Sequence, residues 1–221
     1  MRRALVTGAS GFIGPYLVEQ LQQNGYEVRC LVRPSSDLER LTPLSPEFVF
    51  GDVTDQDSLK AAVEGVDTVF HLAGVIKALG YDAFHRVNAE GTGNLAAACA
   101  KCYPPPTLVL VSSQAAAGTS PPEHRRCESD PVAPVSMYGR SKLAGERAAA
   151  AMADRVPITI IRPGIVIGDG DPLTLQMYRP IDKCLLHLRP TLSNYRYSFV
   201  HVEDLVALLI NAAERAERVN P

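Results

Sequence analysis

The sequence predicts an α/β fold in which a doubly wound parallel sheet carries helices on both faces. Short apolar runs rich in β-branched residues alternate with longer helical segments from the start of the chain to Ile161. Strands that are separated by helices cannot pair as hairpins, so they pair in parallel through right-handed crossovers. In such a fold ligands bind beyond the carboxyl ends of the strands, so the residues that follow each strand are the candidates for a site.

Six apolar runs predict the strands of this sheet. They are Ala4–Thr7, Glu27–Val32, Phe48–Phe50, Thr68–Leu72, Thr107–Val111 and Ile158–Ile161. The helical segments between them are Phe12–Asn24, Asp57–Val63, Asp82–Cys102 and Tyr138–Ala153. After Ile161 the alternation fades. We therefore expect a main domain over residues 1–165 and a small lobe, residues 166–221, packed on it.

Composition and charge favour a small-molecule ligand. The chain has 221 residues, of which 46% are hydrophobic and 21% charged, as is usual for a globular protein. A formal net charge of −2 without a cluster of Lys and Arg predicts no nucleic-acid partner. Apolar runs fall short of the roughly 18 residues of a membrane span, and glycine comes too early for a signal peptide. We expect a cytoplasmic protein with no membrane partner.

The cysteines and histidines do not predict a metal site. Cys99 and Cys102 form a single CxxC motif without the second pair that a zinc site requires. The five histidines also lack the spacing of metal ligands; they are His71, His85, His124, His187 and His201.

Three glycines connect the first strand to the first helix in "LVTGASGFIGPYL". Gly8 allows a tight turn, Gly11 allows a pyrophosphate to approach the backbone, and Gly14 allows the helix to pack on the sheet. The helix N-terminus would then face the anion with its partial positive charge. The spacing is GxxGxxG and not the commoner GxGxxG, so a flexible corner stays open as an alternative. Pro15 requires the helix to begin near Gly11 or later.

The end of the second strand selects between the two nicotinamide dinucleotides. An acidic side chain there would accept hydrogen bonds from a ribose 2′-hydroxyl and repel a 2′-phosphate. In "LVRPSSD" that place is taken by Val32 and Arg33, and Ser35 and Ser36 follow as further donors. This pattern favours NADP over NAD. The alternative is that Arg33 is a solvated loop residue.

Tyr138 and Lys142 lie four residues apart in "SMYGRSKLAGE", at the start of a predicted helix and therefore on one face. A phenol has a pKa of about 10, which must fall by roughly 3 units for proton exchange near neutrality, and a nearby ammonium lowers it. The fifth strand ends in Ser112 and Ser113, of which strand alternation points one into the cleft. This serine would hold a substrate oxygen; alternatively, the two serines only close the strand.

Seven motifs in order carry a resemblance to a known family. They are "TGASGFIG", "GDV", "HLAG", "VNAEGTGNL", "VSS", "YGRSK" and "IRPG". With them the sequence, from about residue 3 to about residue 210, resembles the extended short-chain dehydrogenases/reductases, and more narrowly the NAD-dependent epimerase/dehydratase group. The resemblance implies a dinucleotide-binding Rossmann domain over residues 1–165 and a partial substrate-binding lobe over residues 166–221.

The resemblance also assigns residues to a nicotinamide cofactor, NADP or NAD. It puts Asp52 and Val53 near the adenine, Ala73 and Gly74 beside the adenosine ribose, and a Pro-Gly pair beside the nicotinamide. Arg33 matches the basic residue that NADP-preferring reductases of the family carry. The full set of implied cofactor-binding residues is Gly8, Ser10, Gly11, Phe12, Ile13, Gly14, Arg33, Asp52, Val53, Leu72, Ala73, Gly74, Tyr138, Lys142, Pro163 and Gly164.

Four catalytic residues are implied in the same way. Asn88 would orient the helix that carries the site, and Ser113, which the resemblance favours over Ser112, would bind the substrate oxygen. Tyr138 would be the acid/base. Lys142 would bind the nicotinamide ribose and lower the pKa of the tyrosine.

The expected function is that of an NAD(P)-dependent oxidoreductase acting on a carbonyl or alcohol. The alternatives are a nucleotide-sugar epimerase with tightly bound NAD and a non-catalytic dinucleotide-binding sensor or scaffold. Dehydration is disfavoured because Gln114 and Ala115 stand where the family's dehydratases typically carry Asp-Glu. The chain is short for the resemblance, so much of the substrate lobe is expected to be missing. The resemblance also implies a homodimer through the segments Asp82–Cys102 and Leu143–Ala153.

Overall fold

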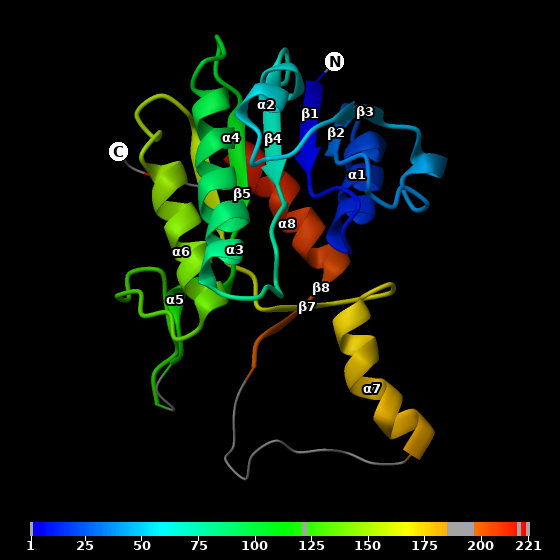
Figure 1. Ribbon diagram of the computed structural model, residues 1–221, viewed down its shortest axis with the longest axis vertical. Coiled ribbons are helices and arrows are strands. Elements are labelled where there is room, and N and C mark those ends of the chain that lie inside the picture. Colours follow the sequence, from blue (N-terminus) through cyan, green and yellow to red (C-terminus); the bar gives the residue numbers. More distant parts are fainter. Residues whose placement is uncertain (1, 121–122, 185–196, 216–217, 220–221) are drawn as a thin grey trace.

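The computed structural model describes residues 2–120, 123–184, 197–215 and 218–219 (Figure 1). A six-stranded sheet in the order β3-β2-β1-β4-β5-β6 forms its centre, and each neighbouring pair of strands is parallel. The strands are β1 (Arg2–Thr7), β2 (Tyr26–Val32), β3 (Glu47–Phe50), β4 (Thr68–His71), β5 (Thr107–Val111) and β6 (Ile158–Ile161). The predicted doubly wound parallel sheet is confirmed.

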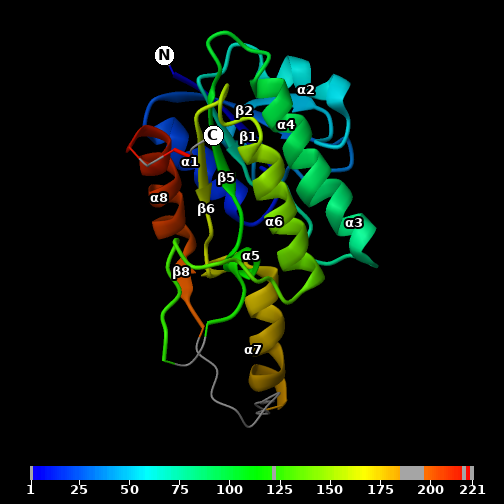
Figure 2. The ribbon, with the colours of Figure 1, turned by 90° about the vertical axis from the view of Figure 1, so that its left-hand side faces the viewer.

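Helices cover both faces of this sheet, as Figure 2 shows with the sheet between them. One face carries α1 (Ile13–Gln23) and α8 (Val202–Arg215), whose apolar side chains share a core with β1, β2, β4 and β5. The other face carries α2 (Gln56–Val63), α4 (Gly91–Cys99) and α6 (Met137–Ala150), which enclose a second core. The sheet alternates between the two cores, with Val6 on the first and Leu5 on the second.

The first helix starts where Pro15 allows. Phe12 is the N-cap of α1 and Ile13 its first residue, so Pro15 lies in the first turn, where a missing N–H is tolerated. The prediction that the helix begins near Gly11 or later is confirmed. Gly25 follows the helix with a φ of 79°, a left-handed conformation that glycine adopts without strain.

The predicted helix over Asp82–Cys102 is divided into three parts. These are α3 (Tyr81–His85), a π-helical segment η2 (Arg86–Glu90) and α4. The predicted helical segment is therefore confirmed as far as Cys99, with a π-helical turn in its middle that accommodates an extra residue. The side chain of Asn88, within this turn, is bonded to the loop after β4.

The segment after β6 forms β7 (Ile165–Ile167), α7 (Pro172–Cys184), β8 (Phe199–His201) and α8. β7 and β8 pair in parallel as a separate two-stranded sheet, and α7 lies beyond them, at the bottom of Figure 1. Two short helices complete the described structure, η1 (Thr42–Leu44) and α5 (Gln114–Ala117). Among the described helices, none combines the length and the apolar composition that crossing a membrane requires.

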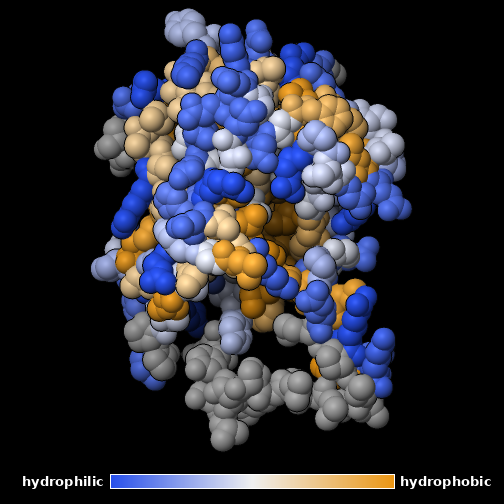
Figure 3. Space-filling view, in the orientation of Figure 1, coloured by the Kyte–Doolittle hydropathy of each residue, from blue (hydrophilic) through white to orange (hydrophobic). Residues whose placement is uncertain are grey.

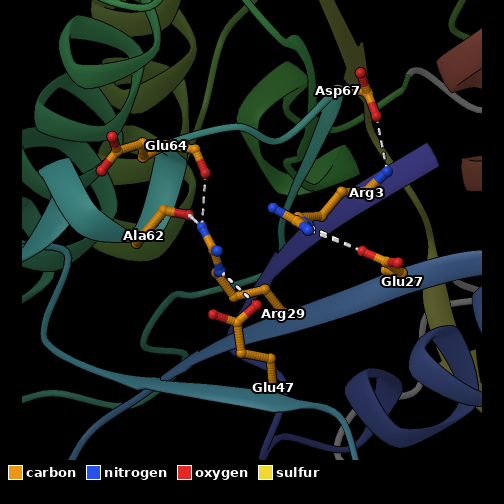
Figure 4. A network of polar contacts seen from close by, with 7 residues as sticks. All are labelled: Arg3, Glu27, Arg29, Glu47, Ala62, Glu64 and Asp67. Atoms are coloured by element: carbon orange, nitrogen blue, oxygen red, sulfur yellow. Dashed lines mark hydrogen bonds and ion pairs between the residues drawn. The ribbon is translucent and has the colours of Figure 1, made fainter. Parts of the chain in front are cut away.

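A buried arginine on β2 holds the end of α2 (Figure 4). The Nη1 of Arg29 donates hydrogen bonds to the carbonyl oxygens of Ala61, Ala62 and Glu64, at 3.1, 3.0 and 2.8 Å. Its Nε forms an ion pair with Glu47 at 3.0 Å. The last carbonyls of a helix lack partners within the helix, so this guanidinium acts as a C-terminal cap that fixes α2 against the sheet.

Candidate active site

In the glycine turn between β1 and α1, two glycines pack against backbone atoms of the protein and one is exposed to solvent. Gly8 has a φ of 71°, and a Cβ there would lie 2.6 Å from the backbone nitrogen of Ala73. A Cβ on Gly14 would lie 1.9 Å from the Ala9 carbonyl oxygen. Gly11, in contrast, is exposed. The turn is therefore a fixed structure with one accessible side, next to the N-terminus of α1.

The first turn of α1 consists of uncharged residues, so the positive end of the helix dipole is available to an anion. Ser10 is exposed, and Phe12 and Ile13 are half-buried beside it. An exposed glycine backed by free helix N–H groups is the cradle that a pyrophosphate fits.

A pocket of about 450 Å³ lies at the carboxyl ends of β2 and β3. Arg33 and Asp52 both line it, so two of the predicted cofactor-binding residues share one cavity. The remaining lining residues are Pro34, Ser35, Phe50, Gly51, Asp55 and Ser58. The Asp52 carboxylate is held in place because its Oδ1 accepts hydrogen bonds from the backbone nitrogen and the hydroxyl of Thr54, both at 2.8 Å. The side chain of Val53 is buried in the core, and its predicted place near the adenine stays a prediction.

The segment after β4 connects the glycine turn to the centre of the site. The backbone nitrogens of Leu72 and Ala73 donate to the carbonyl oxygen and the hydroxyl of Thr7, at 3.1 and 3.3 Å. The next residue, Gly74, is exposed, and a Cβ there would lie 3.1 Å from Asn88 Oδ1 and 3.7 Å from Lys142 Nζ. This segment therefore borders both the predicted pyrophosphate site and the predicted catalytic residues.

Asn88 joins this loop to the helix that carries Tyr138. Its Nδ2 donates to the Val75 carbonyl oxygen and to the Ser141 hydroxyl, both at 2.9 Å, while its Oδ1 accepts from the Val75 nitrogen at 2.8 Å. Asn88 is 1% exposed, so every polar atom of its amide needs a partner inside the protein. The amide thereby fixes the position of α6 relative to β4.

His71 is buried beneath the same loop. Its two ring nitrogens lie 2.7 Å from the Thr7 hydroxyl and 2.9 Å from the Thr92 hydroxyl. Burial, together with the charge of Lys142, lowers the pKa of His71 to about 3. The imidazole is therefore neutral at physiological pH.

The two serines after β5 face different surroundings, as strand alternation predicts. Ser112 is buried and its hydroxyl donates to the Glu146 carboxylate. Ser113 lies close enough to Tyr138 for its hydroxyl to act on the pKa of the phenol. Ser113 also caps α5, since its Oγ accepts from the Ala115 nitrogen at 3.1 Å.

The pKa of Tyr138 differs from the predicted direction. It is raised, because burial of the phenol disfavours the phenolate, and the Ser113 hydroxyl opposes this only in part. The Phe84 ring, 6.2 Å from the Tyr138 ring between centroids, contributes to the apolar surroundings. The expected lowering by Lys142 is not observed, since the phenol's loss of water dominates.

Lys142 is 6% exposed, and its Nζ donates to the Val111 carbonyl oxygen at 2.9 Å. Burial lowers the pKa of Lys142 to about 8, and the nearby Glu146 carboxylate opposes that shift. A fraction of these ammonium groups is therefore neutral a little above physiological pH.

Two residues that the sequence analysis missed lie directly behind the site. Glu146 is 4% exposed and forms a bidentate ion pair with Arg162, with distances of 2.9 and 2.7 Å. The signal was present, because Glu146 follows Lys142 by four residues and so shares its helix face. Arg162 directly precedes Pro163 and Gly164, and the Pro163 carbonyl oxygen accepts from the Gln114 nitrogen at 3.0 Å.

In the space-filling view, apolar side chains surround a hollow in the middle of one face (Figure 3).

Within residues 2–120, 123–184, 197–215 and 218–219, no group of three or more His, Cys, Asp or Glu side chains is arranged to hold a metal ion. His187 lies outside these ranges.

Comparison with known proteins identifies the family. Residues 4–221 match the model of the NAD dependent epimerase/dehydratase family. A ceramide reductase of Caulobacter vibrioides is 35% identical over 93% of this chain and 59% of its own length. A dTDP-6-deoxy-L-talose 4-dehydrogenase of Kitasatospora kifunensis is 33% identical over 77% of this chain and 54% of its own length.

The fold is shared with solved structures of the same kind. The Thermus thermophilus UDP-glucose 4-epimerase in complex with NAD has a TM-score of 0.82, with 27% identity over 97% of this chain and 75% of that one. The chain spans less than three fifths of the length of the two curated relatives, 59% and 54%. With a match that runs from residue 4 to the last residue, this chain belongs to the NAD-dependent epimerase/dehydratase family.

Proposed function

We propose that this chain is an NAD(P)-dependent oxidoreductase that acts on a carbonyl or alcohol, with Tyr138 as the acid/base. The observation that carries the proposal is the arrangement at the carboxyl end of β5, where Ser113 acts on the phenol of Tyr138 and the buried Lys142 donates to the Val111 carbonyl oxygen. Reductases and dehydrogenases among the relatives support it. Both relatives are longer than this chain, so the activity and the substrate class of the whole protein belong to this proposal.

Each candidate catalytic residue has its own proposed role. A bound nicotinamide dinucleotide supplies hydride-transfer chemistry. The Ser113 hydroxyl donates a hydrogen bond to the substrate oxygen. In reduction the Tyr138 phenol would give that oxygen its proton and become a phenolate, and in oxidation the Tyr138 phenolate would take the proton from the alcohol and become a phenol. Lys142 would bind the nicotinamide ribose, as the family resemblance implies.

The cofactor-binding surface fits a dinucleotide in two places. Gly8, Gly11 and Gly14, with the N-terminus of α1, would hold the pyrophosphate. Arg33 and Ser35 line the pocket at the end of β2, where they would bind a 2′-phosphate through charge-assisted hydrogen bonds. We therefore infer a preference for NADP over NAD.

A nucleotide-sugar epimerase is the second candidate, favoured by the likeness to the UDP-glucose 4-epimerase. An epimerase regenerates its cofactor in each turnover. It would therefore be purified with tightly held NAD and would need no added cofactor. A non-catalytic sensor is disfavoured because Ser113, Tyr138 and Lys142 are all in place.

The substitution Tyr138→Phe tests the proposed role. It removes only the hydroxyl, so affinity for NADPH should stay nearly unchanged while turnover falls by roughly 10²- to 10⁴-fold. The measurement is NADPH oxidation by the full-length protein with a panel of ketones and aldehydes, together with cofactor titration by fluorescence. Tyr103→Phe is the matched control, because Tyr103 is fully exposed. Unchanged turnover in Tyr138→Phe would rule out this assignment.

A further inference from the structure

We propose that Glu146 is a positioning residue of the site. With Arg162 and Ser112 it joins the ends of β5 and β6 to α6, and its carboxylate stabilises the ammonium form of Lys142. The inference rests on the proposed function for its catalytic meaning. Its structural part stands on contacts that involve neither substrate nor cofactor.

The contacts of Glu146 reach three of the segments that carry candidate catalytic or nicotinamide-side residues. Directly after β6, Arg162 donates to both carboxylate oxygens, from Nε to Oε1 at 2.9 Å and from Nη2 to Oε2 at 2.7 Å. After β5, the Ser112 hydroxyl donates to Oε1. Glu146 itself lies on α6, two turns beyond Tyr138. One carboxylate thus links the neighbours of Ser113 and Pro163 to the helix of Tyr138 and Lys142.

Two hydrogen bonds to backbone carbonyl oxygens reinforce this link. The Ser112 nitrogen donates to the Ile161 carbonyl oxygen at 2.7 Å, and Lys142 Nζ donates to the Val111 carbonyl oxygen at 2.9 Å. The strand ends and the helix are therefore held at several points within a few residues of each other. A buried ion pair with good bidentate geometry is well suited to fix such an arrangement.

Among the described titratable groups that face Lys142, Glu146 carries the negative charge. The titratable groups that face this part of α6 are Tyr138 and Glu146 on the helix itself, His71 on β4 and Arg162 at the end of β6. His71 is neutral, since its pKa is about 3, and Tyr138 is protonated, since its pKa is raised. The carboxylate that acts on Lys142 is that of Glu146, and it raises the pKa of the lysine against the effect of burial.

The substitution Glu146→Gln tests the charge while keeping the shape. Without the anion, the ammonium form of Lys142 loses its stabilisation, so the pKa of Lys142 should fall by roughly one unit or more. The pKa can be followed directly by NMR of protein labelled at lysine ¹³Cε and ¹⁵Nζ. The chain has five lysines, and the exposed Lys60 and Lys101 serve as internal controls whose titration should not change.

Two further variants separate charge from shape. Glu146→Asp keeps the negative charge but shortens the side chain, so the pKa of Lys142 should stay near its value in the unsubstituted protein. Ser112→Ala removes a hydrogen bond to the same carboxylate without changing any charge, so it should also leave that pKa in place. A pKa of Lys142 that is unchanged in Glu146→Gln, or lowered equally by Asp and Gln, would overturn the proposal.

Folding is checked by circular dichroism and thermal unfolding. If Glu146→Gln does not fold, because it leaves the Arg162 charge unpaired, the double variant Glu146→Gln with Arg162→Gln removes both charges. Because loss of the Arg162 cation by itself raises the pKa of a neighbouring ammonium, the double variant is compared with Arg162→Gln alone. The pKa of Lys142 should be lower in the double variant, and equal values would overturn the proposal. The lysine titration needs no substrate, so its result is independent of Tyr138→Phe. A failure of the proposed function and a failure of this inference are therefore distinguishable.

Discussion

Tyr138 is subject to opposing influences that set how the site can work. Burial raises the pKa of its phenol, and the Ser113 hydroxyl lowers it. The neighbouring Lys142 donates its hydrogen bond to the Val111 carbonyl oxygen. A phenol that keeps its proton is suited to protonate a substrate oxygen, which is the direction of a carbonyl reduction.

Arg33 carries the prediction about cofactor choice. Its replacement in Arg33→Ala removes a cation from the pocket shared with Ser35 and Asp52, where a 2′-phosphate would bind. Because a hydrogen bond to a charged group contributes about 1.5 to 3 kcal/mol, NADP affinity should fall roughly tenfold or more, while NAD affinity changes little.

Titration of both dinucleotides, monitored by fluorescence or calorimetry, measures the ratio. Arg147→Ala is the matched control, since Arg147 is an exposed residue on α6 and should leave both affinities in place. Equal losses for NADP and NAD in Arg33→Ala would contradict a 2′-phosphate contact.

Much of the candidate site could be located by residue type and position. The prediction that strand alternation separates Ser112 from Ser113 is confirmed by their different partners, Glu146 and Tyr138. The direction of the Tyr138 pKa was wrong, because the degree of burial is not encoded in a four-residue spacing. The sequence does not predict the ion pair between Glu146 and Arg162, because the two residues come from different elements and only the fold brings them together.

At the scale of elements, local sequence rules located the six strands of the main sheet and the helices α1, α2 and α6, but not β7, β8, α5, α7 or α8. The limits of the six strands agree with the predicted ones to within two residues, because apolar runs in a parallel sheet are buried on both faces. The segment over Asp82–Cys102 contains a π-helical turn, in which Asn88 is bonded to Val75. A helical pattern in the sequence does not reveal such a contact.

Arg29 gives the prediction at this scale. In Arg29→Met the three carbonyls at the end of α2 lose their donor, and Glu47 loses its partner. The free energy of unfolding should fall by roughly 2 kcal/mol, as expected for buried polar groups left unpaired. Urea unfolding followed by circular dichroism measures it.

Arg3→Met provides the comparison for this variant. Arg3 pairs with Glu27 at 2.9 Å, but both side chains are exposed, so its loss should lower the free energy of unfolding by less than about 1 kcal/mol. Similar losses in the two variants would mean that the cap on α2 contributes no more than a surface ion pair.

At the scale of the molecule, α8 is part of the main core. Leu205, Val206 and Leu209 are buried against α1 and the sheet, and the helix lies in the segment predicted as a small lobe packed on the main domain. β7, α7 and β8, which precede it, lie at the carboxyl end of the sheet (Figure 1). The chain therefore leaves the main layer structure after β6 and returns to it at α8.

Leu209→Ala tests the contribution of α8. Leu209 is fully buried, so the substitution should lower the free energy of unfolding by roughly 2 to 5 kcal/mol. Leu208→Ala is the matched control one residue away, because Leu208 is 49% exposed and should change stability by less than about 1 kcal/mol. Chemical unfolding should show one transition that shifts as a whole. A second transition, with the main one unshifted, would mean that α8 folds separately from the sheet.

The sequence by itself determined the parallel α/β architecture, the glycine turn, and the placing of Tyr138 and Lys142 on one helix face. These features depend on periodicity and on short spacings, which are local properties of the chain. Only the tertiary structure decided that Arg33 and Asp52 share a pocket and that Glu146 pairs with Arg162. The physical reason is that burial and contacts between distant segments arise only when the strands and helices pack together.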